Sequence, residues 1–221
     1  MKTIIHNKHL LIDNGNGAIL VDTGSPASFH KEGVIEVNNE KFNVPTSYMG
    51  LTTTYLSQNV GTEIVGLLGM DILSQLQMWI DIPTFNEIMF YDPKYEAPTY
   101  YKPIETFSMM GCPGIVVNVK HEPVKLLFDT GAQISYLSSR FLTSAPVYDS
   151  VEDFSPLLGG ESYMVNRHML PTTFADKTFD VAYGETPMAI SMLLGAYGID
   201  GIIGWDLIEK FRIIINKGKF V

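Results

Sequence analysis

The sequence is poor in cysteine and in positive charge. Cys112 is the single cysteine among 221 residues, which excludes an intramolecular disulfide framework and fits a reducing compartment. Fifteen lysine and arginine residues stand against 24 aspartate and glutamate residues, for a formal net charge of −9, and they form no basic stripe. We therefore expect neither nucleic acid nor a membrane as a partner.

Signals of targeting and of cofactor chemistry are also missing. Polar residues interrupt the N-terminal stretch MKTIIHNKHLLIDNGNG, which predicts neither a secretion signal nor a membrane anchor, and no apolar run could span a bilayer. The five histidines show no metal-ligand spacing, and no glycine-rich phosphate loop or serine nucleophile elbow is present. We expect a cytoplasmic protein that is made in its final form and uses no metal or cofactor.

The main feature that is present is an internal repeat. Residues 19–28 read ILVDTGSPAS, and residues 126–135 read LLFDTGAQIS, 107 positions later (129 − 22). Residues 65–81, VGLLGMDILSQLQMWID, match residues 200–216, DGIIGWDLIEKFRIIIN, at an offset of 135 (204 − 69). At typical residue usage, two Asp-Thr-Gly triplets occur in a chain of this length by chance at a frequency on the order of 0.1%. Two related units are therefore expected.

Most of the chain is predicted to be β-strand. Residues 78–82, 115–119 and 124–128 are short runs rich in β-branched or bulky apolar side chains. Residues 14–17, Asn-Gly-Asn-Gly, and residues 121–123, His-Glu-Pro, are predicted turns just before the two repeats. Each Asp-Thr-Gly should thus follow the return strand of a hairpin.

A short helix is predicted after each Gly-apolar-apolar-Gly motif. Asp71 and Asp206 are the expected N-caps, because an aspartate side chain can accept hydrogen bonds from unpaired backbone N–H groups there. One face of each helix should be buried, and its residues are Ile72, Leu73 and Leu76 in the first copy and Leu207, Ile208 and Phe211 in the second.

The two units are expected to form two lobes. Residues 92–103, DPKYEAPTYYKP, have the composition of an extended linker. We place the first lobe at residues 1–98 and the second at residues 99–221.

The pair of Asp-Thr-Gly loops predicts a catalytic dyad. One aspartate beside a glycine is usually a turn residue. Two identical loops on similar lobes can instead meet across a pseudo-two-fold axis, which would bring the carboxyl groups of Asp22 and Asp129 together. Both cannot be fully charged at that separation, so they would share a proton. One would accept a proton from a bound water, and the other would donate a proton to the carbonyl oxygen of an amide.

The residues beside the aspartates fit this chemistry. Gly24 and Gly131 allow the backbone to approach the carboxylates closely and to donate N–H groups to them. Thr23 and Thr130 could each reach across the axis and join the two loops.

This arrangement resembles the aspartic peptidases. DTGSPAS and DTGAQIS are similar to the active-site loops of that family, and GLLGMD and GIIGWD are similar to its second motif. By size, the chain resembles two retroviral-protease-like units fused together more than full-length pepsin. The resemblance implies an all-β, two-lobed β-barrel fold with pseudo-two-fold symmetry, a short helix in each lobe and a peptide cleft between the lobes. It assigns catalysis to the two aspartates, the cross-lobe contact to the threonines after them, and close backbone contact to the glycines.

The family closes its cleft with a hairpin flap that lies between the two motifs of a unit. The two repeats differ in the number of residues between these motifs. The middle of the second unit is longer, and its stretch LLGGESYMV (157–165) contains a Gly-Gly turn. We expect the flap there, centred on Gly159 and Gly160, with Tyr163 near the substrate. The alternatives are a plain surface loop and a rival tip at 48–50, Tyr-Met-Gly, in the first lobe.

The residue after each glycine also differs between the loops, as Ser25 in the first and Ala132 in the second. A hydroxyl that donates to a carboxylate lowers its pKa, and alanine cannot do so. The sequence therefore predicts a dyad that works in mildly acidic solution, and it predicts that Ala132→Ser moves the optimum to lower pH.

The predicted function is that of a monomeric aspartic endopeptidase that hydrolyses extended peptides or proteins. One alternative is a weak or inactive peptide-binding or assembly module of the same fold. Another is a two-carboxylate glycosidase, although carboxylates of that class usually lie farther apart and in different environments.

Overall fold

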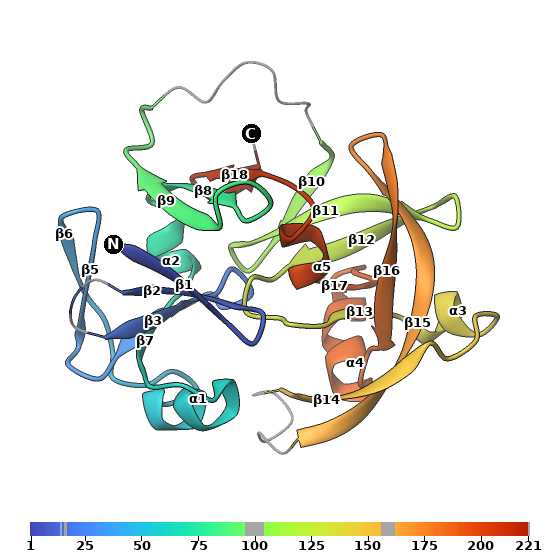
Figure 1. Ribbon diagram of the computed structural model, residues 1–221, viewed down its shortest axis with the longest axis horizontal. Helices are drawn as coiled ribbons and strands as arrows, with labels where there is room; N and C mark the ends of the chain where they lie inside the picture. The colour runs from blue at the N-terminus through green and yellow to red at the C-terminus, as the bar shows by residue number, and fades with distance from the viewer. Residues whose placement is uncertain (14, 16, 96–103, 156–161, 221) are drawn as a thin grey trace.

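The first lobe is built on a five-stranded sheet. The computed structural model describes residues 1–13, 15, 17–95, 104–155 and 162–220 (Figure 1). In sheet order, the strands are β1 (Lys2–His6), β2 (His9–Asp13), β3 (Ala18–Val21), β7 (Ile64–Leu68) and β4 (Phe29–His30). A separate hairpin, β5 (Val34–Val37) and β6 (Glu40–Asn43), and helix α1 (Thr53–Val60) lie between β4 and β7 in the chain.

The second lobe is built on an eight-stranded sheet. Its order is β10 (Thr106–Met109), β11 (Cys112–Val119), β12 (Glu122–Phe128), β17 (Gly201–Ile203), β13 (Ser135–Leu137), β16 (Lys177–Glu185), β15 (Ser162–Phe174) and β14 (Asp149–Phe154). A further pairing between β11 and β15 closes part of this sheet on itself. Helices α3 (Ser139–Leu142) and α4 (Met188–Ala196) complete the lobe.

The same arrangement of parts occurs in both lobes. In the first, β3 pairs in parallel with β7, so that Val21 lies opposite Leu68. In the second, β12 pairs in parallel with β17, so that Phe128 lies opposite Ile203. A helix of four residues follows each time, α2 (Met70–Leu73) and α5 (Trp205–Ile208). The predicted order of strand, Asp-Thr-Gly, Gly-apolar-apolar-Gly and short helix is therefore confirmed in both copies.

A third sheet joins the lobes. Its order is β19 (Lys219–Phe220), β18 (Ile213–Asn216), β8 (Gln77–Asp81) and β9 (Glu87–Tyr91). Trp79 pairs with Ile214, its own counterpart at the repeat offset of 135 (214 − 79). A pairing in which a residue lies opposite its own equivalent from the other repeat is the register that a two-fold axis produces. The axis relating the lobes therefore passes through this pairing.

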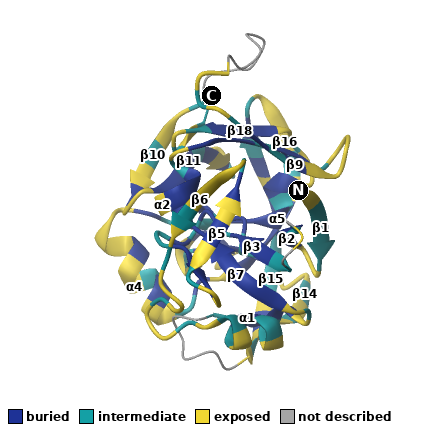
Figure 2. Ribbon diagram, turned by 90° about the vertical axis from the view of Figure 1, so that its left-hand side faces the viewer, coloured by how far each residue is buried: buried dark blue, intermediate teal, exposed yellow. Residues whose placement is uncertain are grey.

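These features confirm the predicted fold class, which is all-β and two-lobed with pseudo-two-fold symmetry and a short helix after each repeat motif. Helices α1, α3 and α4 were not predicted. The strands that lead into the Asp-Thr-Gly loops are buried on both faces, with Val21 and Phe128 fully inaccessible. Figure 2 shows β7 and β18 as buried, whereas α1 and α4 are partly exposed. The core therefore fixes the positions from which both aspartates emerge.

Some predicted boundaries need correction. The turn before the second repeat is made by Lys120 and His121, which both have positive φ, and β12 already begins at Glu122. The predicted turn at 121–123 was therefore one residue late. Residues 96–103 lie outside the described residues, so the linker and the lobe boundary between 98 and 99 stay predictions. Among the described helices, none is long and apolar enough to cross a membrane.

Candidate active site

Each Asp-Thr-Gly loop begins where a parallel pair of buried strands ends. The backbone N–H of Asp22 donates to the carbonyl of Leu68 at 3.0 Å, and that of Asp129 donates to the carbonyl of Ile203, also at 3.0 Å. These bonds extend the β3–β7 and β12–β17 ladders by one residue. The two aspartates therefore leave the sheets at equivalent points and in equivalent directions.

Backbone N–H groups hold one oxygen of each carboxyl group. Gly24 and Ser25 donate to Oδ1 of Asp22 at 2.8 and 3.0 Å, and Gly131 donates to Oδ1 of Asp129 at 2.8 Å. Donors in these positions orient a carboxylate and favour its charged form.

The two loops face each other across the seam. A Cβ atom added to Gly24 would lie 2.3 Å from Cγ of Asp129, and one added to Gly131 would lie 2.8 Å from Cγ of Asp22. Each aspartate therefore packs against the glycine of the opposite loop, at a distance that no side chain would allow. The structure brings Asp22 and Asp129 together, so that each carboxyl group lies against the loop that carries the other.

The pKa values of the two carboxyl groups are shifted in the same direction for related reasons. Burial, and then the charge of Asp129 and the hydrogen bond to it, raise the pKa of Asp22 well above its ordinary value. Burial also raises the pKa of Asp129, while the N–H of Gly131 and the hydrogen bond from Asp22 oppose that rise. Two buried carboxyl groups in contact, both with a raised pKa, favour a state in which the pair holds one proton.

Thr23 and Thr130 form a reciprocal set of hydrogen bonds across the seam. The N–H of each donates to Oγ1 of the other at 3.0 Å. Each hydroxyl then donates to a carbonyl of the opposite lobe, Thr23 to Phe128 at 2.8 Å and Thr130 to Val21 at 2.7 Å. Both threonines are fully buried. The cross-lobe contact expected of these two residues is present.

The second motif of each repeat packs behind the catalytic loop. A Cβ atom on Gly69 would lie 2.6 Å from the carbonyl oxygen of Ala27, and one on Gly204 would lie 2.1 Å from that of Ala132. The next residues, Met70 and Trp205, donate backbone N–H groups to the loops, at Ser25 and Ala132 respectively. The glycines therefore allow the two backbones to make contact.

Asp71 and Asp206 are not N-caps, and that prediction was wrong. The caps are Gly69 and Gly204, and each aspartate lies one residue inside its helix, in the first turn. Their carboxylates instead accept hydrogen bonds from serine hydroxyls of the same lobe, from Ser28, which lies just before β4, and from Ser135, the first residue of β13. This serine–aspartate pair supports each loop from behind. Its signal was the Ser that ends both quoted repeats, six residues after each Asp (28 − 22, 135 − 129).

Ser25 does not act on the dyad as predicted. Its hydroxyl donates to the carbonyl of Ala27 at 2.9 Å, and only its backbone N–H reaches Asp22. The local turn supplies a nearer acceptor, as serine side chains commonly find in turns. The Ser25 hydroxyl therefore does not lower the pKa of Asp22, and that prediction was wrong. It also gives no reason to expect that Ala132→Ser changes the pH optimum.

Cys112 lies beneath the first catalytic loop. Its thiol is buried, and Sγ lies 3.5 Å from the carbonyl oxygen of Gly24. Burial, followed by the nearby charges of Asp22 and Asp129, raises the pKa of this thiol to about 12. Cys112 is therefore an unreactive part of the packing in the folded protein.

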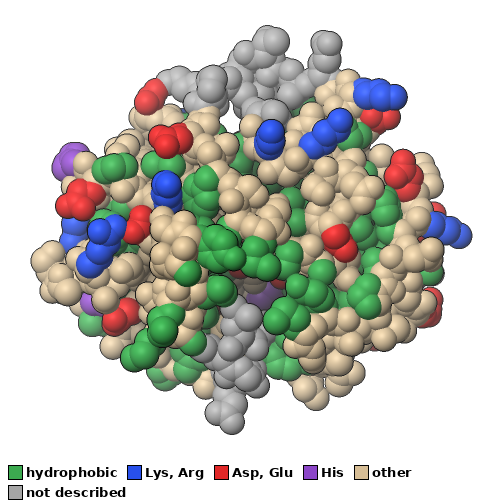
Figure 3. Space-filling model, turned by 180° about the vertical axis from the view of Figure 1, so that it is seen from behind, with side chains coloured by type: hydrophobic (Ala, Val, Ile, Leu, Met, Phe, Trp, Pro, Cys, Tyr) green, Lys and Arg blue, Asp and Glu red, His purple; other side chains and the backbone are tan. Residues whose placement is uncertain are grey.

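A cavity of about 120 Å³ opens in front of the dyad. Both lobes line it, with the two aspartates at one side and mainly apolar side chains around them; among these are Leu20, Leu51, Leu56, Leu67, Phe154, Ile190 and Ile202. Figure 3, which views the molecule from behind relative to Figure 1, shows hydrophobic side chains on both sides of a hollow. Apolar walls around a few polar groups are typical of a ligand site.

The hairpin of the second lobe borders this cavity. Strands β14 and β15 pair from Asp149–Arg167 to Phe154–Ser162, and Tyr163 lines the cavity. The hydroxyl of Tyr163 lies 3.2 Å from that of Tyr136, which donates to Asp153. These three residues connect both strands of the hairpin to the strand after the second catalytic loop. Gly159 and Gly160, the expected tip of a flap, lie outside the described residues.

The first lobe presents a different structure at the same place. Tyr48 and Leu51 form an isolated bridge around a two-residue turn, in which Met49 and Gly50 have φ of 48° and 84°. The chain then enters α1 at Thr53 rather than a second long strand. Leu51 and α1 thus border the cavity where the second lobe has a hairpin.

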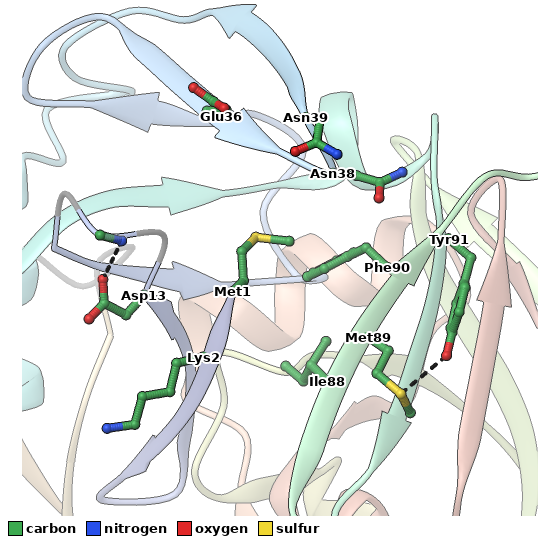
Figure 4. A pocket seen from close by; sticks show the side chains of 11 residues that line it. Met1, Lys2, Asp13, Glu36, Asn38, Asn39, Ile88, Met89, Phe90 and Tyr91 are labelled. Atoms are coloured by element: carbon green, nitrogen blue, oxygen red, sulfur yellow. Dashed lines mark hydrogen bonds between the residues drawn. The ribbon is translucent and has the colours of Figure 1, made fainter.

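A larger hollow of about 800 Å³ lies away from the dyad, between β1, the β5–β6 turn and β9. Figure 4 shows that its charged and amide side chains, such as Lys2, Glu36 and Asn38, point apart and do not converge on one spot. Asp13 accepts the N–H of Gly15 at 2.7 Å. Among the described residues, no group of three or more His, Cys, Asp or Glu side chains could hold a metal ion.

Comparisons with known proteins find matches among solved structures. No protein-family model matches the chain, and no curated protein sequence matches it. Among solved structures, the chain is similar to an aspartic proteinase from Irpex lacteus. The match covers 96% of this chain and 92% of that one, with 14% sequence identity and a TM-score of 0.42.

Proposed function

We propose that the protein is an aspartic endopeptidase in which Asp22 and Asp129 activate a water molecule to hydrolyse a peptide bond. The observation that carries this proposal is the packing of each aspartate against the glycine of the opposite loop, within 3 Å of a hypothetical Cβ. Two carboxyl groups held in this way share one proton, and a pair with one proton can act as acid and base in the same step.

Burial raises the pKa of both carboxyl groups and backbone N–H groups lower it in both, so either member of the pair can hold the proton. We assign the base to Asp129 and the acid to Asp22, because the charge of Asp129 is a further cause that raises the pKa of Asp22. Asp129 takes a proton from water as the water oxygen attacks the carbonyl carbon, and Asp22 donates its proton to the carbonyl oxygen, which gives a gem-diol. The C–N bond then breaks as Asp129 gives its proton to the leaving amine nitrogen and Asp22 takes a proton from a hydroxyl of the gem-diol, so that the pair returns to its starting state. General acid–base catalysis of this kind contributes typically about 10²–10⁴-fold to the rate.

The cavity favours a peptide in an extended conformation. Its walls come from both lobes, so a ligand that reaches the dyad must lie along the seam. Here Gly159, Gly160 and Tyr163 are assigned to a flap on the second lobe that covers the substrate. The substrate is a peptide or protein. The enzyme is a monomer, because one chain supplies both aspartates, and we assign it to the cytoplasm. The boundary between the lobes is placed between residues 98 and 99.

The principal alternative is a peptide-binding module that has lost turnover. The first lobe favours it to some degree, because α1 occupies the place where a second hairpin would lie. The glycosidase alternative fits the site less well, because the carboxyl groups of Asp22 and Asp129 are packed against each other's loops, whereas those of glycosidases stand about 5–10 Å apart.

A peptide library and an inhibitor separate these functions. Wild-type protein and Asp129→Asn are incubated with the same peptide library between pH 4 and pH 7, and the products are read by mass spectrometry. The proposal predicts cleavage by wild type, no cleavage by Asp129→Asn, and inhibition by an active-site-directed aspartic peptidase inhibitor. Inhibitor binding without any cleavage would favour the binding module, and neither binding nor cleavage would reject both.

A further inference from the structure

His9 is a buried polar residue of the cavity that the proposed mechanism does not use. It is the first residue of β2 and is only 1% exposed, yet it lines the same cavity as Asp22 and Asp129. Its Nδ1 is buried and has no hydrogen-bond partner within the described part of the chain. Leaving a buried polar atom unpaired costs free energy, and such an atom in a native structure calls for an explanation.

The surroundings of His9 place this atom between the lobes. Its ring packs against that of Phe154, at the end of β14 in the second lobe, with ring centroids 6.3 Å apart and planes at 30°. The ring of Tyr55, from α1, packs edge-on against the same Phe154 at 6.4 Å. The Tyr55 hydroxyl is also buried and without a partner in the described residues. His9 and Tyr55, both from the first lobe, therefore each have a buried hydrogen-bonding atom without a partner in the described ranges, beside the ring of Phe154.

Several other polar groups of the cavity wall are already engaged. Asp22 and Asp129 accept backbone N–H groups. Tyr136, Tyr163 and Asp153 form their own connected cluster. A ligand that enters the cavity therefore meets His9 in its wall, a polar side chain with one ring nitrogen, Nδ1, that has no partner among the described residues and no accessible surface in this ring orientation.

The charge state of the ring limits the ligand. Burial lowers the pKa of His9, against the opposing effect of the backbone carbonyls of His6 and Asn7, so the ring is neutral near pH 7. A neutral imidazole nitrogen either donates or accepts one hydrogen bond, according to the tautomer. A neutral ring gives no advantage to a carboxylate, which the negative dyad would also repel. Carboxamides and hydroxyls satisfy the atom in either tautomer, because each can both donate and accept.

We propose that His9 is a specificity-determining residue, whose ring turns to present Nδ1 to an uncharged polar side chain of the substrate, a carboxamide or a hydroxyl, beside the scissile bond. This inference rests on the proposed function, because it takes the cavity to be the place where a peptide lies. It adds a preference for Gln, Asn, Ser or Thr at one position of a peptide whose other contacts in the cavity are apolar.

The test measures binding without turnover. Octapeptide mixtures, each with one fixed residue at one position, are passed over immobilised Asp129→Asn protein, and the retained peptides are quantified by mass spectrometry. The fixed residues are Gln, Asn, Ser, Thr, Leu, Met, Glu and Lys. The proposal predicts that at one position Gln, Asn, Ser or Thr is retained about tenfold better than Leu or Met, the ratio expected of one hydrogen bond to a buried partner.

The His9→Phe variant in the same background assigns the preference to the ring. Phenylalanine keeps the packing on Phe154 and removes the unpaired nitrogen, so the melting temperature should be unchanged or higher. If His9→Phe does not fold, His9→Leu replaces it in the same binding measurement. His168→Phe is the matched control, because His168 Nδ1 contacts the Ala145 carbonyl at 2.9 Å and the residue does not line the cavity. The polar preference should vanish in the His9 variant and persist in the His168 variant.

Three results would overturn the inference: no peptide retained, no preference for polar residues, or the same preference in His9→Phe. Failure of the proposed function looks different. If wild-type protein binds these peptides with the polar preference but does not cleave them, that result would contradict the proposed peptidase activity and would still support the proposed role of His9.

Discussion

Thr23 and Thr130 exchange backbone-to-hydroxyl hydrogen bonds across the seam between the lobes, each at 3.0 Å. Both hydroxyls continue to a carbonyl of the opposite lobe. All of the donors and acceptors are buried, so the set is worth more than its members taken singly. It fixes the two catalytic loops relative to each other, and therefore the separation of the carboxyl groups.

Replacing one of these threonines by valine should destabilise the protein and reduce activity. Thr23→Val keeps the shape but leaves the N–H of Thr130 and the carbonyl of Phe128 without partners, at a cost of about 1–3 kcal/mol for each buried group. Urea unfolding measures this loss. Thr23→Ser, which keeps the hydroxyl, should cost less than half as much, and equal losses in the two variants would contradict the assigned role.

The two aspartates should both be needed for hydrolysis. Asp22→Asn and Asp129→Asn each remove one member of the acid–base pair and should lower kcat/KM by at least about 10²–10⁴-fold, while circular dichroism stays that of wild type. Asp180→Asn, at an exposed position on β16, is the control and should leave kcat/KM unchanged. Activity retained in either dyad variant would show that the pair does not act together.

Gly24 should not tolerate a methyl group. In Gly24→Ala the new Cβ would lie 2.3 Å from Cγ of Asp129, so the carboxyl group must move and the shared proton is lost. We expect at least a hundredfold loss of kcat/KM. Gly195→Ala, in α4 with nothing within 4 Å of its Cβ, should instead keep full activity and gain about 0.5–1 kcal/mol of stability. Comparable loss in both variants would contradict the packing of the two loops.

The dyad should make stability depend on pH in a defined direction. The folded-state pKa of Asp22 is raised, so its stabilising contribution is complete below the unfolded value of about 3.9 and is lost as pH rises through the folded value. Asp22→Asn cannot ionise and should therefore be more stable than wild type at pH 7, by roughly 1–3 kcal/mol. Near pH 3 the difference should shrink. Urea titrations at both pH values measure it, and a larger gain at pH 3 would reverse the sign and refute the shift.

The single cysteine gives a direct check of packing beneath the dyad. Burial raises the pKa of Cys112 to about 12, so little thiolate exists at pH 8 and the sulfur is out of reach. A thiol-reactive reagent should modify the native protein only as fast as it unfolds, and urea should accelerate the reaction strongly. Rapid modification of the native protein would place Cys112 at the surface.

The sequence predicted the features that the two repeats share. Asp-Thr-Gly needs its glycine because each loop packs against the other, and Gly69 and Gly204 are needed because two backbones touch there. These packing requirements apply to both copies, so the same residue types recur at a fixed offset in the sequence. The sequence also predicted the all-β class, since the strands that enter the loops are buried on both faces.

Features present in only one place were harder to predict. The Ser25 hydroxyl could bond either to its own turn or to Asp22, and only the three-dimensional structure decides between Ala27 and the carboxylate. Asp71 had the residue type of an N-cap, but Ser28, 43 positions away in the chain, donates hydrogen bonds to it instead. Likewise α1 and the cavity position of His9 depend on tertiary packing, which a single sequence does not display.

The central claim is that Asp22 and Asp129 share one proton, and a carboxyl titration tests it most directly. Protein labelled with ¹³C at the aspartate carboxyl carbons is titrated from pH 2 to pH 9, and Asp22→Asn and Asp129→Asn assign the two signals. The structure predicts that both signals respond in both of two separate steps, and that in each variant the remaining aspartate titrates in a single step. Two independent single-step titrations near the ordinary aspartate pKa in the wild-type protein would contradict the claim.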